Sequence, residues 1–266
     1  MPITRDVIRY DGVLLYESEG GTSDRMLAGE EGFGYPKRNN MIDQIGDPYI
    51  NLYRRSTSGS RTFTISLQIK AESPDLLLAF INDWEETHAT GAERVLKRVT
   101  TTGGVYYLDC VPKGPVWKSR GQTSIAVTQG YEAANPWWYG DAVSVVSAFA
   151  GVGPVNVPVV NAGNIPSWIT AEIVNAVTDP KIAVSTGYFI ELDYTNGAGE
   201  TIDINCRPAA VIEHSVAGDI FGYRTSDSWV NRVQIPVGAS NVALTAVAGG
   251  VAACTITHTP LYGALS

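Results

Sequence analysis

The sequence contains one pair of carboxylates at a spacing that catalysis could use. Glu191 and Asp193 lie two residues apart in a segment of alternating apolar and polar residues, so both would point to one face of a β-strand. Two carboxylates on one face could serve as the paired acids of a glycoside hydrolase. Any strand with one solvated face shows the same pattern, and that is the interpretation we favour. An enzyme of this kind is therefore only a minor alternative.

Other patterns for catalysis or metal binding are missing from the sequence. None of its three histidines, His88, His214 and His258, has a second histidine or cysteine at the spacing of metal ligands. His88 is expected at the polar end of a helix and His258 at the end of a strand, both in solvated or capping roles. The nucleophile elbow, the P-loop and the dinucleotide fingerprint are absent. The sequence predicts no catalytic residue, no metal and no cofactor.

Two further residue types could carry chemistry or binding. The cysteines, Cys110, Cys206 and Cys254, are odd in number and lie among alternating apolar residues, which indicates buried thiols rather than disulfides. Two isolated tryptophans, Trp168 and Trp229, could act as platforms that stack on a sugar or as anchors that contact a protein partner. A carbohydrate-binding module therefore remains an alternative function.

Composition limits the class of protein and its partners. The chain has 266 residues and is 44% hydrophobic, which favours two folded domains with sizeable cores. No apolar run reaches the length of a membrane span, and the charged N-terminus does not resemble a secretory signal, so we expect no membrane insertion and synthesis in a cytoplasm. Residues 1–140 hold 15 Lys and Arg against 17 Asp and Glu, whereas residues 141–266 hold 4 against 10. This acidic balance argues against binding to nucleic acid phosphates.

Local patterns predict the elements that would position these residues. Strict alternation at 62–70 predicts a half-buried strand, and Ser73 followed by Pro74 predicts the start of an amphipathic helix over about 73–90. Strands are expected at 93–99, 105–111 and 123–128, and a long loop at 20–47. From residue 141 onward, short strands predict a β-sandwich. We expect two β-hairpins in it, which join 188–194 to 201–206 and 241–247 to 251–257.

A segment just before the change in charge resembles the interdomain signature of phage distal tail proteins (Dit) and related siphophage tail components. In that signature a strand ends in an acidic residue or Asn, and a proline, two or three aromatics and a glycine follow. The matching residues are Asn135, Pro136, Trp137, Trp138, Tyr139 and Gly140. Downstream, 159–166 resembles the family's V-x-N-x-G…P turn, 226–241 its S-x-W…L-x-P-G-x-N segment, and 260–263 its closing strand. The likeness is strong from Val127 onward and weaker before it.

The resemblance implies a mainly all-β fold with two domains. Residues 1–138 would form a split-barrel or β-sandwich domain with one α-helix, and residues 139–266 a galectin-like β-sandwich. It also implies a structural virion protein of the tail tip of a long-tailed phage, assembled in the host cytoplasm. Such proteins form a hexameric ring that joins the tail tube protein to a hub, fibre or receptor-binding protein, and DNA passes through the lumen without specific binding. From their expected exposure, we place Glu85, Glu86 and the 20–47 loop at the ring interface.

Overall fold

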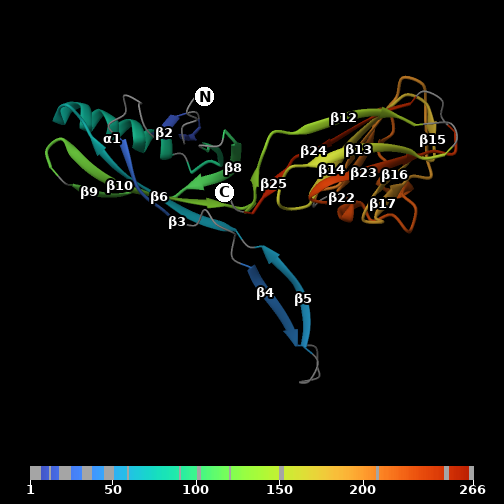
Figure 1. Cartoon of the computed structure of the whole chain (residues 1–266), viewed down its shortest axis with the longest axis horizontal. Helices are drawn as coiled ribbons and strands as arrows, with labels where there is room; N and C mark the ends of the chain where they lie inside the picture. Colours follow the sequence, from blue (N-terminus) through green and yellow to red (C-terminus); the bar gives the residue numbers. More distant parts are fainter. Residues whose placement is uncertain are drawn as a thin grey trace. The chain divides into compact units, whose positions relative to one another are not determined.

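The computed structural model is mostly β-structure with one α-helix in its described part (Figure 1). It describes residues 7–11, 13–17, 25–31, 38–44, 51–58, 60–89, 91–100, 103–119, 121–149, 153–207, 210–248 and 252–263. The chain divides into two compact units, here called unit 1 (Met1–Tyr139 with Gly263–Ser266) and unit 2 (Gly140–Tyr262). The chain therefore passes between the units twice, at Tyr139–Gly140 and at Tyr262–Gly263. The prediction of a mainly all-β fold with one helix is confirmed.

Unit 1 is built on an antiparallel sheet with the strand order β2-β1-β7-β8-β10-β6-β3, in which β9 also pairs with β10 and β11 with β8. The strands are β1 (Val7–Tyr10), β2 (Val13–Glu17), β3 (Arg25–Glu31), β6 (Arg61–Lys70), β7 (Arg94–Val99), β8 (Val105–Pro112), β9 (Val116–Ser119), β10 (Ser124–Ala133) and β11 (Trp138–Tyr139). Residues of β6 alternate as predicted, because Phe63, Ile65, Leu67 and Ile69 are buried and the residues between them are not. The strands expected at 93–99 and 105–111 are observed as β7 and β8, which pair antiparallel.

Helix α1 (Pro74–His88) begins where the sequence predicts. The Ser73 side chain accepts a hydrogen bond from the Leu76 backbone N–H at 3.3 Å, and Pro74 occupies the first turn, where its missing N–H costs nothing. The buried face consists of Leu77, Trp84 and His88, which are seven and four residues apart and therefore lie on one side of the helix. Leu76 is apolar but is 55% exposed. The helix therefore contacts the sheet through a narrower stripe than its apolar residues suggest.

The prediction of a long loop at 20–47 is wrong. This region contributes β3, which pairs with β6, and β4 (Arg38–Gln44), which forms a two-stranded sheet with β5 (Asn51–Ser58). Both pairings contain a register shift, between Leu27 and Gly29 and between Asn39 and Met41. A bulge interrupts the alternation of side chains between the two faces of a strand. Strands without clean alternation give little signal in a sequence, and this explains the error.

Unit 2 is a sandwich of two antiparallel sheets around one core. One sheet has the order β12-β24-β14-β19-β20-β21, with β22 also paired to β14, and the other has the order β13-β23-β16-β17. Their bounds are β12 (Val143–Ala148), β13 (Val155–Asn161), β14 (Ser167–Val174), β16 (Lys181–Val184), β17 (Phe189–Glu191), β19 (Thr201–Asn205), β20 (Val211–His214), β21 (Gly218–Asp219), β22 (Gln234–Ile235), β23 (Gly238–Thr245) and β24 (Ala253–His258). A short pair, β15 (Val177–Thr178) with β18 (Thr195–Asn196), lies outside both sheets. The predicted sandwich is confirmed.

Both predicted hairpins in unit 2 are wrong. Strand β17 pairs with β16, whereas β19 pairs with β14 and β20 in the other sheet. Strand β23 pairs with β13 and β16, whereas β24 pairs with β12 and β14. Each connection thus crosses from one sheet of the sandwich to the other. Alternation identifies which side of a strand faces the core, and two strands that face the same core from opposite sheets show the same pattern.

In the described part of the chain, no helix is both long enough and apolar enough to cross a bilayer.

Candidate functional site: the junction signature and an aromatic surface of unit 2

The residues of the predicted interdomain signature close unit 1. Trp138 is fully buried, with its ring centroid 6.5 Å from that of Phe63. The Tyr139 hydroxyl donates to Asp109 at 2.8 Å, and the Tyr139 ring stacks on Tyr107. Pro136 is also buried. These aromatics therefore fix the end of unit 1 by packing, immediately before the chain enters unit 2.

The first residues of the signature form a turn. The Asn135 side-chain oxygen accepts a hydrogen bond from the Trp137 backbone N–H at 3.3 Å, which is an Asx-turn that leads into β11. An aspartate would accept the same bond, so either an acidic residue or Asn at this position would form the turn. Gly140 begins unit 2, and its N–H donates to the Pro260 carbonyl at 3.0 Å.

The second predicted motif, at 159–166, is a structural turn of unit 2. The Asn161 side chain is buried, donates to the carbonyls of Ile165 and Ile235 at 2.9 and 3.2 Å, and accepts from the Gly163 N–H at 2.9 Å. Gly163 packs directly against the Leu261 backbone, where a Cβ would lie 2.3 Å from the carbonyl oxygen. The motif needs Asn for its three hydrogen bonds and Gly for the close approach.

His88 is buried, so the prediction of a solvated role is wrong, while its ring bonds to a carbonyl in the last turn of its own helix. One ring nitrogen, Nδ1, lies 2.7 Å from the Trp84 carbonyl and must carry a proton, because a carbonyl only accepts. Nε2 then accepts from the Tyr131 hydroxyl at 3.0 Å. The ring also stacks on Tyr10 and Trp84. Burial lowers the pKa of His88, and the Trp84 carbonyl opposes that shift only in part.

His258 is likewise buried at the end of β24, and burial lowers its pKa. The expected solvated role is therefore wrong here too. His214 is buried and fixes a turn: its Nδ1 accepts from the Val216 and Ala217 N–H groups at 3.1 and 2.9 Å. Its Nε2 therefore carries the proton and donates to Asn196 and Glu200 at 2.9 and 3.2 Å. These bonds assign His214 a structural role.

The carboxylates that could have formed a glycosidase pair are engaged differently. Glu191 accepts from the Lys181 ammonium at 3.0 Å, while Asp193 is exposed beyond the end of β17. Neither residue lines the two surface hollows described below. This geometry favours a solvated strand face.

All three cysteines are free and buried, as predicted. Burial raises the pKa of Cys110, Cys206 and Cys254 to about 12. Such thiols remain protonated at neutral pH and are unreactive.

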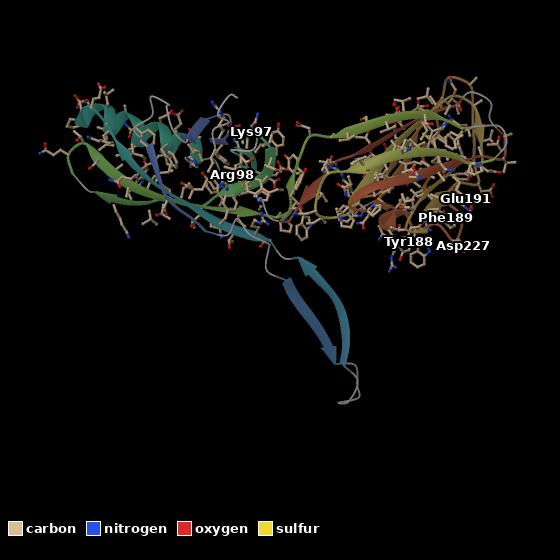
Figure 2. The ribbon with its side chains drawn as sticks, viewed as in Figure 1. Lys97, Arg98, Tyr188, Phe189, Glu191 and Asp227 are labelled. Atoms are coloured by element: carbon tan, nitrogen blue, oxygen red, sulfur yellow. The ribbon has the colours of Figure 1, made fainter. Side chains whose placement is uncertain are left out.

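The two candidate platform tryptophans of unit 2 differ in their surroundings. Trp168 packs against the sandwich core, and its indole N–H donates to the Asn231 carbonyl at 3.0 Å. Trp229 is 52% exposed and borders a hollow of about 430 Å³. Only Trp229 is therefore placed to offer a ring to a ligand. Figure 2 labels Tyr188 and Asp227 in this part of unit 2.

Two arginines close to Trp229 were not predicted as site residues. Arg232 lies 4.9 Å from the Trp229 ring centroid, and Arg224 lies 4.9 Å from that of Phe221. The signal that could have found Arg232 is its position three residues after Trp229, in a half of the chain that holds only 4 Lys and Arg. Phe221 begins the 3₁₀ helix Phe221–Tyr223, Arg224 caps its end, and both residues line the same hollow as Trp229.

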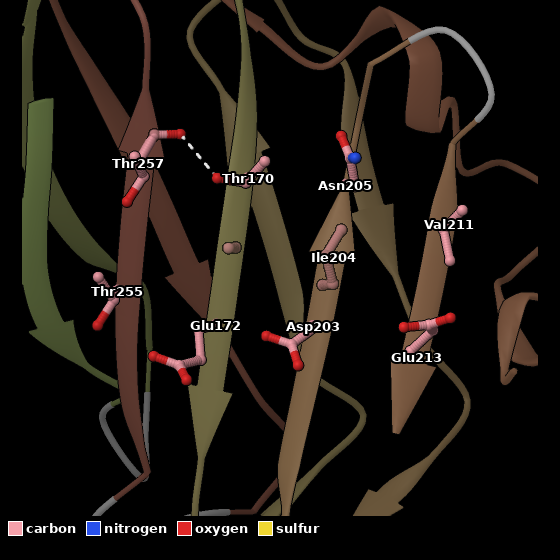
Figure 3. A pocket seen from close by; sticks show the side chains of 10 residues that line it. Thr170, Glu172, Asp203, Ile204, Asn205, Val211, Glu213, Thr255 and Thr257 are labelled. Carbon is pink, nitrogen blue, oxygen red and sulfur yellow. Dashed lines mark hydrogen bonds between the residues drawn. The ribbon is translucent and has the colours of Figure 1, made fainter. Parts of the chain in front are cut away.

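A second hollow, of about 440 Å³, lies on the outer face of the larger sheet of unit 2 (Figure 3). Three carboxylates cross it in one row, which we call the acidic row: Glu172 on β14 pairs with Asp203 on β19, which pairs with Glu213 on β20. All three are exposed. Among the described residues, no group of three or more His, Cys, Asp or Glu is placed to hold a metal ion. Like charges directly opposite each other destabilise a sheet.

Asp203→Asn is expected to stabilise unit 2 by about 0.2–1 kcal/mol, because Asp203 faces a carboxylate on both sides. Urea denaturation would measure the gain, which should shrink in 1 M NaCl because salt screens exposed charges. Asp141→Asn is the matched control, since Asp141 is exposed and lies outside the row. Equal effects of the two substitutions would contradict repulsion within the row.

The predicted ring residues Glu85 and Glu86 are both exposed on α1. Their role in a ring interface stays a prediction.

Comparison with known proteins supports the fold. No family model and no curated protein matches the chain. The crystal structure of SPP1 Dit (gp 19.1), described as a paradigm of the hub adsorption apparatus of phages that infect Gram-positive bacteria, matches with a TM-score of 0.69 and 15% identity. The match covers 96% of this chain and 98% of SPP1 Dit.

This chain has the Dit fold. The likeness spans both units and is not limited to a sandwich, which many unrelated proteins share. The resemblance predicted from the Asn135–Gly140 signature is thus confirmed for the fold. A chain of the phage P2 baseplate in its activated conformation also matches, with a TM-score of 0.47 and 10% identity, covering 99% of this chain and 100% of that one. That second likeness is too weak to add support.

Proposed function

We propose that this chain is a structural protein of the tail tip of a long-tailed phage. The observation that carries the proposal is the Dit fold over nearly the whole chain, since SPP1 Dit is described as a paradigm of a hub adsorption apparatus. The chain would form a ring, expected to be hexameric, that joins the tail tube protein to the hub, fibre or receptor-binding protein. Unit 1 would form the ring and unit 2 an outward platform. It would act by assembly in the virion and not as an enzyme.

Two features of the chain are compatible with this role. Its net charge of −8 disfavours binding to the phosphate backbone of DNA, so DNA could pass through the lumen without being held. His88, His214 and Glu191 are engaged in packing, a turn and an ion pair, and these contacts support a structural role. A heterologous interface repeated around an axis closes a ring without any new chemistry.

Electron microscopy of the purified protein, alone and co-expressed with the tail tube protein of the same genome, tests the proposal. We expect closed rings with an axial opening, and light scattering should report the mass of several subunits. Monomers under every condition, including co-expression with the tail tube protein, would contradict the function.

Charge reversal on α1 tests the predicted interface separately. The double substitution Glu85→Lys and Glu86→Lys should reduce the fraction of protein in rings, whereas Glu93→Lys, exposed on unit 1 outside the helix, should leave it unchanged. If rings still form with the α1 substitutions, the interface lies elsewhere on the chain, and the proposed function is not contradicted.

A further inference from the structure

The hollow beside Trp229, here called the Trp229 hollow, has the dimensions of a small-ligand site. Its volume of about 430 Å³ lies within the range of roughly 300–1,000 Å³ that is common for such sites. Its lining includes Phe221, Arg224, Ser226, Trp229 and Asn231. An aromatic ring, a guanidinium, a hydroxyl and an amide thus surround one concavity. These are the groups that pair with the C–H faces, acidic groups and hydroxyls of sugars.

The indole of Trp229 is held in place without a ligand. The backbone N–H of Trp229 donates to the Phe189 carbonyl at 3.0 Å. The Arg232 guanidinium, which is not part of the lining, lies 4.9 Å from the Trp229 ring centroid and 5.5 Å from that of Tyr188. Arg232 also donates to the Tyr188 hydroxyl at 3.1 Å. A ring fixed in this way loses little conformational entropy when a ligand stacks on it.

The loop that carries Trp229 is anchored to β17 on one side and β14 on the other. The buried Ser228 hydroxyl donates to the Glu191 carbonyl at 3.1 Å and accepts from the Glu191 N–H at 2.9 Å. On the other side of Trp229, the Trp168 indole N–H holds the Asn231 carbonyl at 3.0 Å. Trp168 is therefore a positioning residue for this loop and not a platform.

One cationic side chain, Arg224, lines the hollow, while the carboxylate of Asp227, which accepts from the Ser226 hydroxyl at 3.3 Å, is not part of the lining. Arg224 is exposed, its guanidinium lies over the Phe221 ring, and it forms no ion pair with any residue in the described part of the chain. Arg224 and Arg232 are two of only 4 Lys and Arg in residues 141–266. A protein interface is usually broader and flatter than one small hollow, and two cations on an acidic unit are too few to hold a nucleic acid.

We propose that the Trp229 hollow binds an acidic saccharide, meaning a sugar that bears a carboxylate or phosphate group. The C–H face of the sugar would stack on Trp229, its acidic group would pair with Arg224, and its hydroxyls would bond to Ser226 and Asn231. This inference goes beyond the proposed role in assembly and does not depend on ring formation. It would give the chain a direct contact with a glycan surface.

Titration of the full chain with defined oligosaccharides, followed by calorimetry, tests the proposal. The probes are an oligogalacturonate (carboxylate), a mannose-6-phosphate glycan (phosphate) and neutral galactose and mannose oligomers. Binding of either acidic probe, at least about tenfold tighter than binding of the neutral ones, supports the site, and the tighter of the two identifies the acidic group. Equal binding of the neutral oligomers, or no binding of any probe, would overturn it.

Variants then locate the binding. Trp229→Ala should weaken it about tenfold through lost stacking, and Trp229→Phe should restore part of the loss. Arg224→Gln should abolish the preference for acidic probes while leaving weak binding to the sugar ring. Arg207→Gln is the matched control, because Arg207 is exposed in unit 2 but does not line the hollow. Wild-type binding by both the Trp229→Ala and Arg224→Gln proteins, with their fold verified by circular dichroism, would contradict the site.

Discussion

Gly163→Ala is expected to destabilise unit 2 by about 2–3 kcal/mol or more, as strongly as a severe overpacking substitution. A Cβ on residue 163 would lie 2.3 Å from the Leu261 carbonyl oxygen and 2.7 Å from the Leu261 nitrogen. Backbone atoms cannot rotate away as a side chain can. The same carbonyl accepts from the N–H groups of Asn164 and Ile165 at 3.0 and 3.2 Å, so relief of the clash would break hydrogen bonds.

Urea denaturation of the wild type and the variant, followed by circular dichroism, measures this loss. Gly222→Ala is the matched control, since a Cβ there would meet nothing within 4 Å and its φ is not in the left-handed region. We expect the control to change the free energy of unfolding by less than about 0.5 kcal/mol. If Gly163→Ala and Gly222→Ala unfold at the same urea concentration, the close approach to Leu261 does not limit stability.

The parts of the fold that the sequence predicts are those in which one local pattern has one structural solution. Alternation at 62–70 gives a strand with a buried face, and Ser73 with Pro74 gives a helix start. The two false hairpins show the limit of this reasoning. The partners of a strand depend on the twist and closure of whole sheets. No residue within 188–194 or 201–206 indicates which strand is the partner.

The sequence predicts a site residue correctly where the residue type and its neighbours in the sequence are enough to indicate its surroundings. Buried thiols follow from their apolar neighbours, and Trp229 follows from its type. His88 was misplaced because its burial depends on Tyr10 and Tyr131, which approach it from β1 and β10. Arg224 was missed because its position beside the hollow depends on the tertiary course of the chain. Local sequence patterns therefore do not predict contacts between segments that are distant in the sequence.

Trp138→Ala is expected to destabilise unit 1 by about 3–5 kcal/mol, the cost of a large cavity in a packed core. The Trp138 side chain is fully buried and packs against Phe63 of β6, which itself stacks on Tyr131 of β10. Removal of the indole would therefore loosen the packing on two neighbouring strands of the sheet, β6 and β10. If the alanine variant fails to fold, Trp138→Phe, which retains an aromatic ring, should give a smaller and measurable loss.

Hydrogen exchange measured on peptides separates this effect from a general loss of stability. Amides of β6 and β10 should exchange faster in the Trp138 variant, whereas those of β14 and β24 in unit 2 should keep their protection. Trp137→Ala is the matched control, because the neighbouring indole is only partly buried and should cost about 1 kcal/mol. Faster exchange in β14 and β24 as well would mean that the signature stabilises both units together. Equal losses for Trp137 and Trp138 would mean that the buried indole is not the anchor of unit 1.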